Sequence, residues 1–257
     1  MAARRNRTRT LLAVGGAALV AFSVSGCGGA DASDAPAEKK SFPLSGKTLT
    51  IDAGNSAVDL VPADVKAVEV TRRVDGWVVM GNGPHPRWKM TDGTLTLDVK
   101  CSGVVSDCVA QHEIKVPRGV AVTVNGDNGG VRATGFDTAL RLKADNGAMT
   151  VRDSSGPLDL ESDNGKITAE GISAKDLAVK SSNGGVRIAF TTVPDSVEAT
   201  SDNGGIVIDL PRSDTSYAVK TRTDNGKIDV AVPTSDSSSH VVKARTDNGK
   251  ITVRTVN

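Results

Sequence analysis

Hydrophobic and polar residues alternate with a period of two along most of the second half of the chain. Within this half, Asp-Asn-Gly or its near copy Ser-Asn-Gly recurs seven times, at spacings of 18, 18, 19, 20, 22 and 23 residues. Apolar residues stand six and four positions before each asparagine and three and five positions after it, with few exceptions. This pattern predicts one strand on each side of every Asn-Gly, and a period near twenty predicts one copied and stacked unit. The repeated asparagines are Asn128, Asn146, Asn164, Asn183, Asn203, Asn225 and Asn248.

The inward-facing parity of the apolar positions changes by one residue at each Asn-Gly, which requires a bend there. Asn and Gly both tolerate the positive φ that such a bend can use. We therefore predict an all-β fold, a single-stack parallel β-solenoid whose coils of 18–23 residues turn at Asn-Gly corners. An antiparallel meander of hairpins is the alternative, because Asn-Gly is also a strong hairpin signal. The solenoid is favoured because stacking places like residues on like and lets the asparagines hydrogen-bond as a ladder.

The repeat extends in degenerate form to the first half of the chain. Asn55 is flanked at the same offsets by Leu49, Ile51, Val58 and Leu60, which predicts an early coil of the capping kind. Further strands are predicted over residues 67–74, 95–100 and 108–116, with a projecting loop over residues 81–89. At the other end, an uncovered last coil over residues 251–256 would expose a strand edge able to pair with another chain. The sequence leaves the oligomeric state open.

The first residues have the pattern of an export signal. Four arginines precede an apolar run over residues 11–24, which is short for a membrane span, and Val24-Ser25-Gly26-Cys27 follows. This order resembles a bacterial lipobox with Val24 in place of leucine, and it predicts cleavage before Cys27 and lipidation of its thiol. Two acyl chains on such a cysteine hold a protein stably on a membrane. An ordinary secretory signal is the alternative, and the general or twin-arginine export route is not decided.

Four segments follow from this organisation. Residues 1–26 are the predicted lipoprotein signal peptide, and residues 27–43 are the lipidated cysteine with a flexible tether. Residues 44–118 are predicted as irregular N-terminal β coils, and residues 119–257 as the regular Asp-Asn-Gly solenoid. Without the signal peptide, 27 basic and 30 acidic residues remain. No basic stretch remains that could bind along the phosphate backbone of a nucleic acid, so we expect no nucleic-acid partner.

Two cysteines remain beside Cys27, and their number fits an exported chain. Cys101 and Cys108 predict a disulfide that closes a short loop. A metal pair is the alternative, but the nearby His112 does not complete a site.

An acidic residue precedes the repeated asparagine in six coils. Stacking would align these carboxylates in a column with a spacing of about 5 Å. Each could cap its own turn through a side-chain hydrogen bond, bind Ca²⁺, or form part of a polysaccharide-cleaving pair. Capping is favoured because the residue recurs in six of the seven coils, whereas a catalytic pair stands at one place. The six residues are Asp127, Asp145, Asp163, Asp202, Asp224 and Asp247.

Motifs of the common enzyme classes are absent from the sequence. The three histidines, His85, His112 and His240, have no nucleophile turn near them, and no zinc-protease, Walker or dinucleotide-binding motif is present. No catalytic residue and no cofactor other than Ca²⁺ is therefore predicted. Trp77 and Trp88 lie in or beside the predicted loop, where a tryptophan can contact a sugar or protein or can cover the end of a core.

The chain also resembles the putative-adhesin family of exported bacterial proteins with β-strand repeats, a domain of unknown function. The resemblance rests on Ile114-Lys115-Val116-Pro117-Arg118-Gly119, followed by the serial Asn-Gly coils, and covers residues 44–257. It implies a β-solenoid displayed outside the cell and implies no catalytic residues.

Three functions are consistent with these features. The first is a binding or structural module on the outer face of the cell membrane, which adheres to a cell-wall polymer or a protein and presents a long polar face. The second is an envelope-stress or signalling accessory that binds a membrane partner through an apolar patch near one end. The third is a polysaccharide-active enzyme with paired carboxylates in a groove. The sequence does not name the ligand, the partner or the physiological process.

Overall fold

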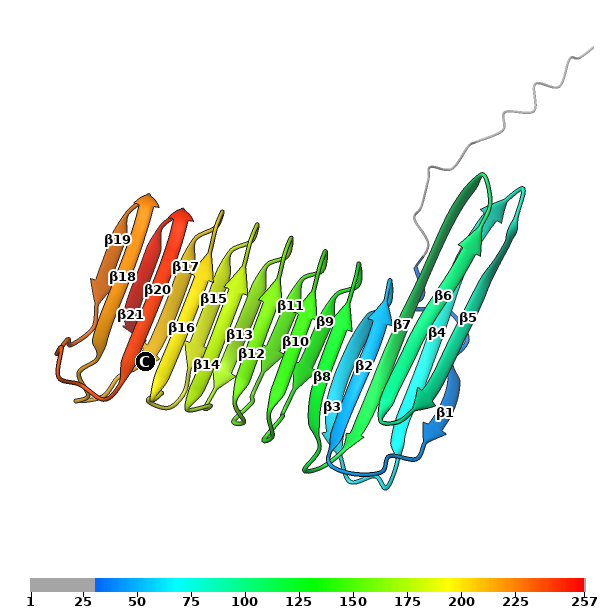
Figure 1. Cartoon of the computed structure of the whole chain (residues 1–257), viewed down its shortest axis with the longest axis horizontal. Coiled ribbons are helices and arrows are strands. Elements are labelled where there is room, and N and C mark those ends of the chain that lie inside the picture. The colour runs from blue at the N-terminus through cyan, green and yellow to red at the C-terminus, as the bar shows by residue number, and fades with distance from the viewer. Residues whose placement is uncertain (1–30, 257) are drawn as a thin grey trace, which may run out of the picture.

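A computed structural model describes residues 31–256, whose regular elements are all β-strands in two long sheets (Figure 1). The predicted signal peptide, residues 1–26, and Cys27 lie outside the described residues. The eleven-stranded sheet has the order β1 (Glu38–Phe42), β4 (Val68–Val79), β7 (Val105–Pro117), β3 (Ala57–Ala63), β9 (Val131–Thr134), β11 (Met149–Arg152), β13 (Ile167–Ile172), β15 (Val186–Phe190), β17 (Ile206–Pro211), β21 (Ile251–Val256) and β19 (Ile228–Ala231). The ten-stranded sheet has the order β18 (Ala218–Asn225), β20 (Val241–Asn248), β16 (Ser196–Ser201), β14 (Asp176–Ser181), β12 (Leu158–Ser162), β10 (Leu140–Ala144), β8 (Ala121–Gly126), β2 (Thr48–Gly54), β6 (Thr94–Ser102) and β5 (Asn82–Thr91).

The strands of the repeat pair in parallel and in the register that the sequence indicates. Leu140 pairs with Leu158, and Met149 pairs with Ile167. Each turn of the chain places one strand in each sheet, and we call such a pair of strands a coil. The antiparallel meander is therefore excluded between β8 and β21. Antiparallel pairs occur only near the N-terminal end, in β1·β4, β4·β7 and β5·β6 of the described chain.

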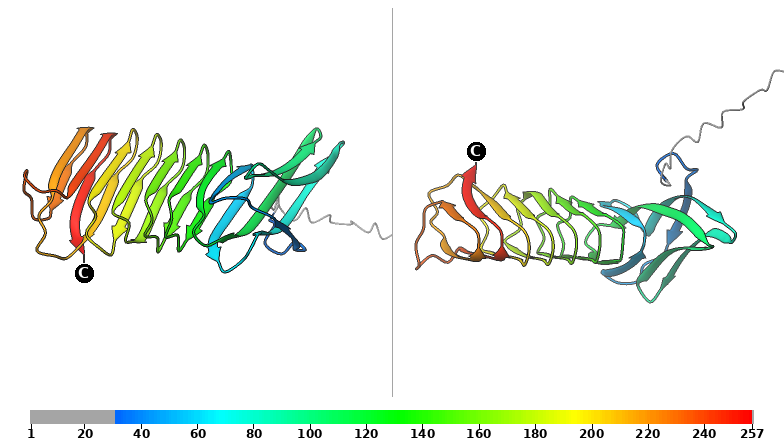
Figure 2. Two further views of the ribbon diagram at one scale, coloured as in Figure 1. Left: turned by 60° about the horizontal axis from the view of Figure 1, so that its bottom comes forward. Right: turned by 90° about the horizontal axis from the view of Figure 1, so that it is seen from above.

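A single hydrophobic core fills the space between the two sheets from Phe42 to Val253. The strict alternation of buried and exposed positions, as in β10 and β14, turns every second side chain inward. Because this core runs without a break across residue 118, the predicted boundary between residues 44–118 and 119–257 does not separate two cores. Figure 2 shows the coils as one continuous stack from two further sides.

The corners at Asn-Gly differ from the prediction. None of the seven Asn-Gly pairs of the repeat has a positive φ. Glycine is needed there for another reason, because the preceding coil approaches closely: a Cβ on Gly165 would lie 2.0 Å from the carbonyl oxygen of Gly147. The same close approach recurs at Gly147, Gly184, Gly204 and Gly249. The parity change is thus achieved without left-handed backbone.

The coils at both ends of the stack are not arranged in chain order. The coil β2–β3 lies between β6–β7 and β8–β9, and the last coil in sequence, β20–β21, lies between β16–β17 and β18–β19. The outermost coil at the C-terminal end is therefore β18–β19, where Ile228 is 44% exposed, whereas Ile251 of the last coil is fully buried. The expectation that residues 251–256 form the exposed edge is wrong, and the early coil around Asn55 is likewise not terminal.

Four long strands, β4 to β7, extend beyond the stack at its N-terminal end (Figure 1). The coil β2–β3 pairs with β6 only over residues 94–96 and with β7 only over residues 111–117, so the remaining parts of β6 and β7 stand free of it. We call this projection, residues 74–86 and 98–109, the arm. The predicted loop over residues 81–89 is wrong, because those residues form most of β5.

The predicted tether over residues 27–43 is also too long. Residues 38–42 form β1, which pairs with β4, and the side chain of Phe42 is buried against the ring of Trp88. The burial of Phe42 thus holds β1 in place. The polar composition of the segment before it gave no indication of a strand.

Candidate functional site

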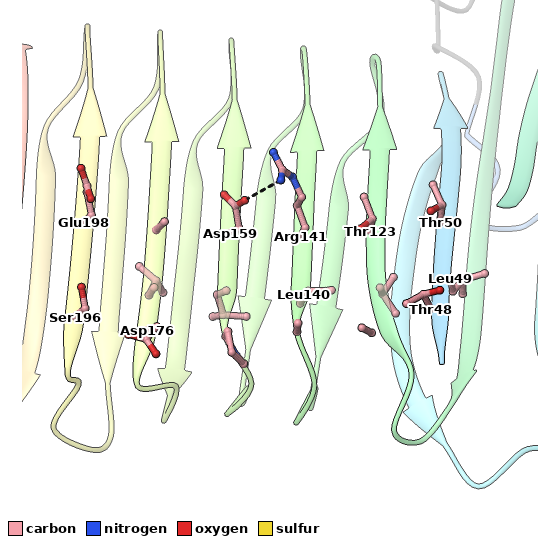
Figure 3. A pocket seen from close by; sticks show the side chains of 17 residues that line it. Thr48, Leu49, Thr50, Thr123, Leu140, Arg141, Asp159, Asp176, Ser196 and Glu198 are labelled. Carbon is pink, nitrogen blue, oxygen red and sulfur yellow. Dashed lines mark ion pairs between the residues drawn. The ribbon is translucent and has the colours of Figure 1, made fainter. Parts of the chain in front are cut away.

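A shallow groove of about 340 Å³ crosses the outer face of the ten-stranded sheet over β2, β8, β10, β12, β14 and β16 (Figure 3). It lies at the beginnings of these strands, on the opposite edge of the stack from the asparagines, which follow their ends. Six adjacent strands span about 24 Å at the usual strand spacing. The groove is therefore long and narrow enough to receive an extended chain rather than a compact molecule.

Two rows of outward-facing side chains form the floor of the groove. The side chains of the first row are short. Along this row, Ala121 is followed by Ala139, Pro157 and then Asp176. The second row, which the strand register aligns, consists of Thr50, Thr123, Arg141, Asp159, Ala178 and Glu198. The short side chains of the first row, with Thr50, Thr123 and Ala178 of the second, create the hollow because the neighbouring row, with Lys143 and Glu161, carries longer ones.

The groove carries more negative than positive charge. Arg141 forms an ion pair with Asp159 at 3.4 Å between Nη1 and Oδ2, whereas no ion pair involves Asp176 or Glu198 within residues 31–256. Both carboxylates are thus available to an incoming ligand. Hydroxyl groups of Thr48, Thr50 and Ser196 add uncharged donors and acceptors. Such a surface favours neutral or amine-bearing ligands and repels polyanions.

The predicted asparagine column forms a continuous hydrogen-bonded ladder along the other edge. From Asn128 onward, each Nδ2 donates to the Oδ1 of the asparagine in the adjacent coil toward the N-terminal end of the stack, as Asn164 does to Asn146 at 2.9 Å. The ladder follows the spatial order of the coils, so Asn248 bridges Asn203 and Asn225. Asn55 joins at its beginning by accepting from Asn128. The asparagines therefore tie the coils together, and their amides are engaged with one another.

The six acidic residues before these asparagines lie along the same edge. Within residues 31–256 they form no side-chain hydrogen bond to their own turns, and Asp224 and Asp247 instead pair with Arg222 and Arg245. The favoured capping role is therefore not what the structure has. In the same part of the chain, no group of three or more acidic, histidine or cysteine side chains is arranged to hold a metal ion.

Cys101 and Cys108 form the predicted disulfide, which joins β6 to β7 inside the arm. It borders an open hollow of about 910 Å³ between the arm and the first asparagines. Beyond it, at the end of the arm, several large apolar side chains are exposed. The sequence did not reveal this cluster, because its residues lie between the strands predicted within the irregular segment of residues 44–118.

The three histidines lie apart from one another, and only His240 lies near the groove, at its end on β16. His112 is fully buried where the arm meets the stack, and its burial, together with the neighbouring Arg72 cation, lowers its pKa to about 4. His240 donates from Nδ1 to the carbonyl oxygen of Pro194 at 2.8 Å. His85 is exposed on β5. His240 precedes Val241, which pairs with the groove-lining Ser196, and its Nδ1 lies 3.6 Å from Oδ1 of Asp195.

Comparison with proteins of known structure gives low similarities. The chain is 13% identical to a protein from Bacteroides fragilis described as a putative adhesin, with 86% of this chain and 97% of that chain covered and a TM-score of 0.41. A putative adhesin from Parabacteroides merdae is 15% identical, with 87% and 98% covered and a TM-score of 0.37. A putative cell adhesion protein from Clostridium sporogenes is 12% identical, with 86% and 99% covered and a TM-score of 0.35.

No protein of curated function matches the chain. Within residues 31–256 there is no helix with the length and apolarity needed to cross a membrane. The family model described as Toastrack DUF4097 matches residues 89–256, which is more than half of the chain and includes every copy of the Asn-Gly repeat. The chain therefore belongs to the Toastrack DUF4097 family.

Proposed function

We propose that this protein is a lipoprotein of the outer face of the cell membrane, anchored at Cys27, that binds an extended wall polymer without catalysis. A β-solenoid with Asn-Gly corners serves as a rigid support in this proposal. The observation that carries it is the groove across six strands, whose floor of short side chains and hydroxyls matches a long, uncharged or amine-bearing chain. The export signal and the lipobox-like Val24-Ser25-Gly26-Cys27 support the location.

A binding role fits the groove better than glycoside hydrolysis does. A glycosidase needs one carboxyl group held protonated in an apolar setting and a second one at a fixed distance. The side chain of Asp159 is 50% exposed and is paired with Arg141, so it does not stand in the apolar setting that such an acid needs. Glu198 lies two strands away from Asp159, with Ala178 between them in the register. This arrangement favours contact with a ligand over proton transfer to it.

A membrane-protein partner is the second candidate. It calls for an apolar patch near one end of the solenoid, and the end of the arm carries one. The groove and the arm lie at different places, so their roles can be tested separately.

Binding of the full-length chain to purified cell wall tests the first candidate. Ala139→Tyr and Ala178→Tyr fill the groove at exposed positions without entering the core, and Thr168→Tyr on the outer face of the other sheet is the matched control. We expect saturable binding to wall stripped of anionic polymers. Both groove variants should weaken it by about tenfold or more, equivalent to about 1.4 kcal/mol, and the control should leave it unchanged.

The same binding experiment is repeated with added Ca²⁺, because the acidic column remains a proposed Ca²⁺ site. Binding that requires added Ca²⁺ and is lost in Asp163→Asn would assign the polymer to the asparagine edge instead of the groove. Absence of wall binding in both conditions would contradict the wall-binding proposal and leave the membrane-protein partner as the candidate.

A further inference from the structure

The end of the arm carries most of the large apolar side chains that are exposed in the described chain. Met80 is 84% exposed and Val104 is 75% exposed, and Trp77, Val79 and Val105 are each about half exposed. We call these five residues the arm tip. Apart from Val61 on β3, the other exposed large apolar residues, Ile228 and Val230, lie on β19 at the opposite end of the stack. A cluster of this kind on a projection marks a contact surface.

The backbone of the arm tip is already paired. Antiparallel pairing of β4 with β7 continues to Val79 and Val105, and the amide of Val104 donates to the carbonyl of Val79 at 3.1 Å. The two turns also pack closely, since a Cβ on Gly81 would lie 1.9 Å from the carbonyl oxygen of Ser102. The tip is therefore a preformed apolar surface, and few of its backbone groups would need water if it entered an apolar medium.

The charges near the arm tip suit a lipid surface. No acidic residue occurs over residues 76–86 or 99–106, and Lys100 is the only lysine or arginine in these two segments. Acidic residues flank them at Asp75, Asp98 and Asp107, and Asp107 pairs with Trp77 at the base of the tip. A tryptophan beside aliphatic side chains and a nearby lysine is the composition that settles at the boundary between lipid headgroups and acyl chains.

The path of the chain brings its N-terminal end toward the arm tip. The strand β1 runs antiparallel to β4, with Glu38 opposite Arg72, so the chain before Glu38 leads along β4 in the direction of the tip. The backbone amide of Asp31 donates to Oδ2 of Asp75 at 3.1 Å, which fixes the beginning of the described chain beside the arm. Met80 follows Asp75 by five strand residues, a distance of about 17 Å. Cys27 precedes Asp31 by four residues, which reach at most about 14 Å.

We propose that the arm tip inserts into the same bilayer that holds the lipid on Cys27, as a second membrane contact that fixes the orientation of the stack. The inference rests on the proposed lipid anchor, because the similar reach of the two segments places the anchored cysteine and the tip at comparable depth. The arm projects past the edge that carries the asparagines (Figure 1). Contact at the tip would therefore turn this edge toward the membrane and present the groove, at the opposite edge, to the wall.

The two tryptophans allow a direct test with the full-length lipidated chain. In Trp88→Phe only Trp77 at the tip fluoresces, and in Trp77→Phe only Trp88 does, which packs against Arg72 at 3.9 Å from the guanidinium carbon to the ring centre. Each variant is reconstituted in vesicles of phosphatidylcholine and phosphatidylglycerol, with and without brominated acyl chains. We expect brominated lipid to quench Trp77 at least twofold more than Trp88, and bound vesicles to shield Trp77 from aqueous iodide. If Trp88→Phe does not fold, the difference between wild type and Trp77→Phe gives the same quantity.

A second measurement separates the tip from the anchor. The chain from residue 27 onward with Cys27→Ser, which carries neither the apolar run of residues 11–24 nor the lipid, is added to the same vesicles, and its sedimentation with them is followed. Met80→Asp with Val104→Asp should lower this binding by about tenfold, because each removes a large apolar group from the interface. The matched control, Ile228→Asp with Val230→Asp, removes exposed apolar residues at the far end and should leave binding unchanged.

Several results would overturn the inference. If brominated lipid does not quench the fluorescence of Trp77, the arm tip does not insert into the bilayer. Shielding of Trp77 without vesicles, rising with protein concentration, would assign the tip to a second copy of the chain. Shielding in native membranes but not in protein-free vesicles would assign it to a membrane protein. The mass of the chain purified from membranes reports the lipid on Cys27 independently, so loss of the anchor and loss of tip insertion are distinguished.

Discussion

At the scale of single residues, space between coils rather than backbone conformation determines what the corners accept. The glycine after each repeated asparagine faces a carbonyl oxygen of the neighbouring coil, and a methyl group does not fit. The next position is open, and the copies there differ: Ala148 and Lys166 occupy it in two coils, and Gly185 in a third. Two neighbouring positions of one corner thus have opposite requirements.

Alanine substitutions at these two positions should therefore differ strongly. In Gly165→Ala the new Cβ would lie 2.0 Å from the carbonyl oxygen of Gly147, so the coils must separate, and we expect a loss of about 2–4 kcal/mol in the free energy of unfolding. In Gly185→Ala the nearest contact is 3.6 Å, and the change should stay within about 0.5 kcal/mol. Urea denaturation measures both, and equal losses would show that the close approach does not exist.

The buried His112 gives stability a dependence on pH. Its pKa of about 4 in the folded chain lies below the ordinary value of 6.5, so the unfolded chain binds the proton more tightly between these values. Stability should therefore decrease as the pH falls from 6.5 to 4, by up to about 3 kcal/mol from this residue. His112→Leu should remove this part of the slope, and the exposed His85→Gln should not. Denaturation series at several pH values compare the three chains, and an unchanged slope in His112→Leu would contradict the assignment.

At the scale of elements, strands and their register could be predicted because inward and outward side chains alternate with few exceptions. The arm could not. Its strand β5 contains Gly83, Pro84 and Pro86, which are typical of a loop. The strand lies at the edge of its sheet, where a proline without an amide hydrogen costs no ladder bond. The groove was also missed, because short outward-facing residues such as Ala139 and Ala178 form a hollow only when their strands stand side by side.

The disulfide should stabilise the arm without affecting the stack. It closes a loop with a sequence separation of seven residues between Cys101 and Cys108, for which the chain-entropy estimate is about 2–3 kcal/mol. In Cys101→Ser with Cys108→Ser we expect faster hydrogen exchange of amides in β6 and β7 near the tip. Amides in β12 and β14, several coils away, should exchange at wild-type rates. Faster exchange throughout the stack would show that the arm and the coils unfold as one unit.

At the scale of the whole molecule, the coils at both ends are interlocked. The last coil is held on both sides, and Arg254 on β21 donates from Nε to Oδ1 of the buried Asp209 on β17 at 2.7 Å. All coils share one register, so the alternation of residues does not reveal which coils are neighbours. The spacings between the asparagines do indicate the exception, because the last two, 22 and 23 residues, exceed the earlier ones. The longer connections around residues 212–217 and 232–240 allow the chain to form β18–β19 one coil further out and then to place β20–β21 in the space left between.

The central claim is the order of the coils in the stack, and one pair of substitutions at its C-terminal end tests this order most directly. Ile228 and Ile251 occupy the same repeat position in β19 and β21 and pair with each other in the register. Ile251 is fully buried and Ile228 is 44% exposed, so we measure the free energy of unfolding of Ile251→Ala and Ile228→Ala. The interlocked order predicts a loss of about 2–5 kcal/mol for Ile251→Ala and below about 1 kcal/mol for Ile228→Ala. A larger loss for Ile228→Ala would place the last coil at the end of the stack, in sequence order, and would contradict this account.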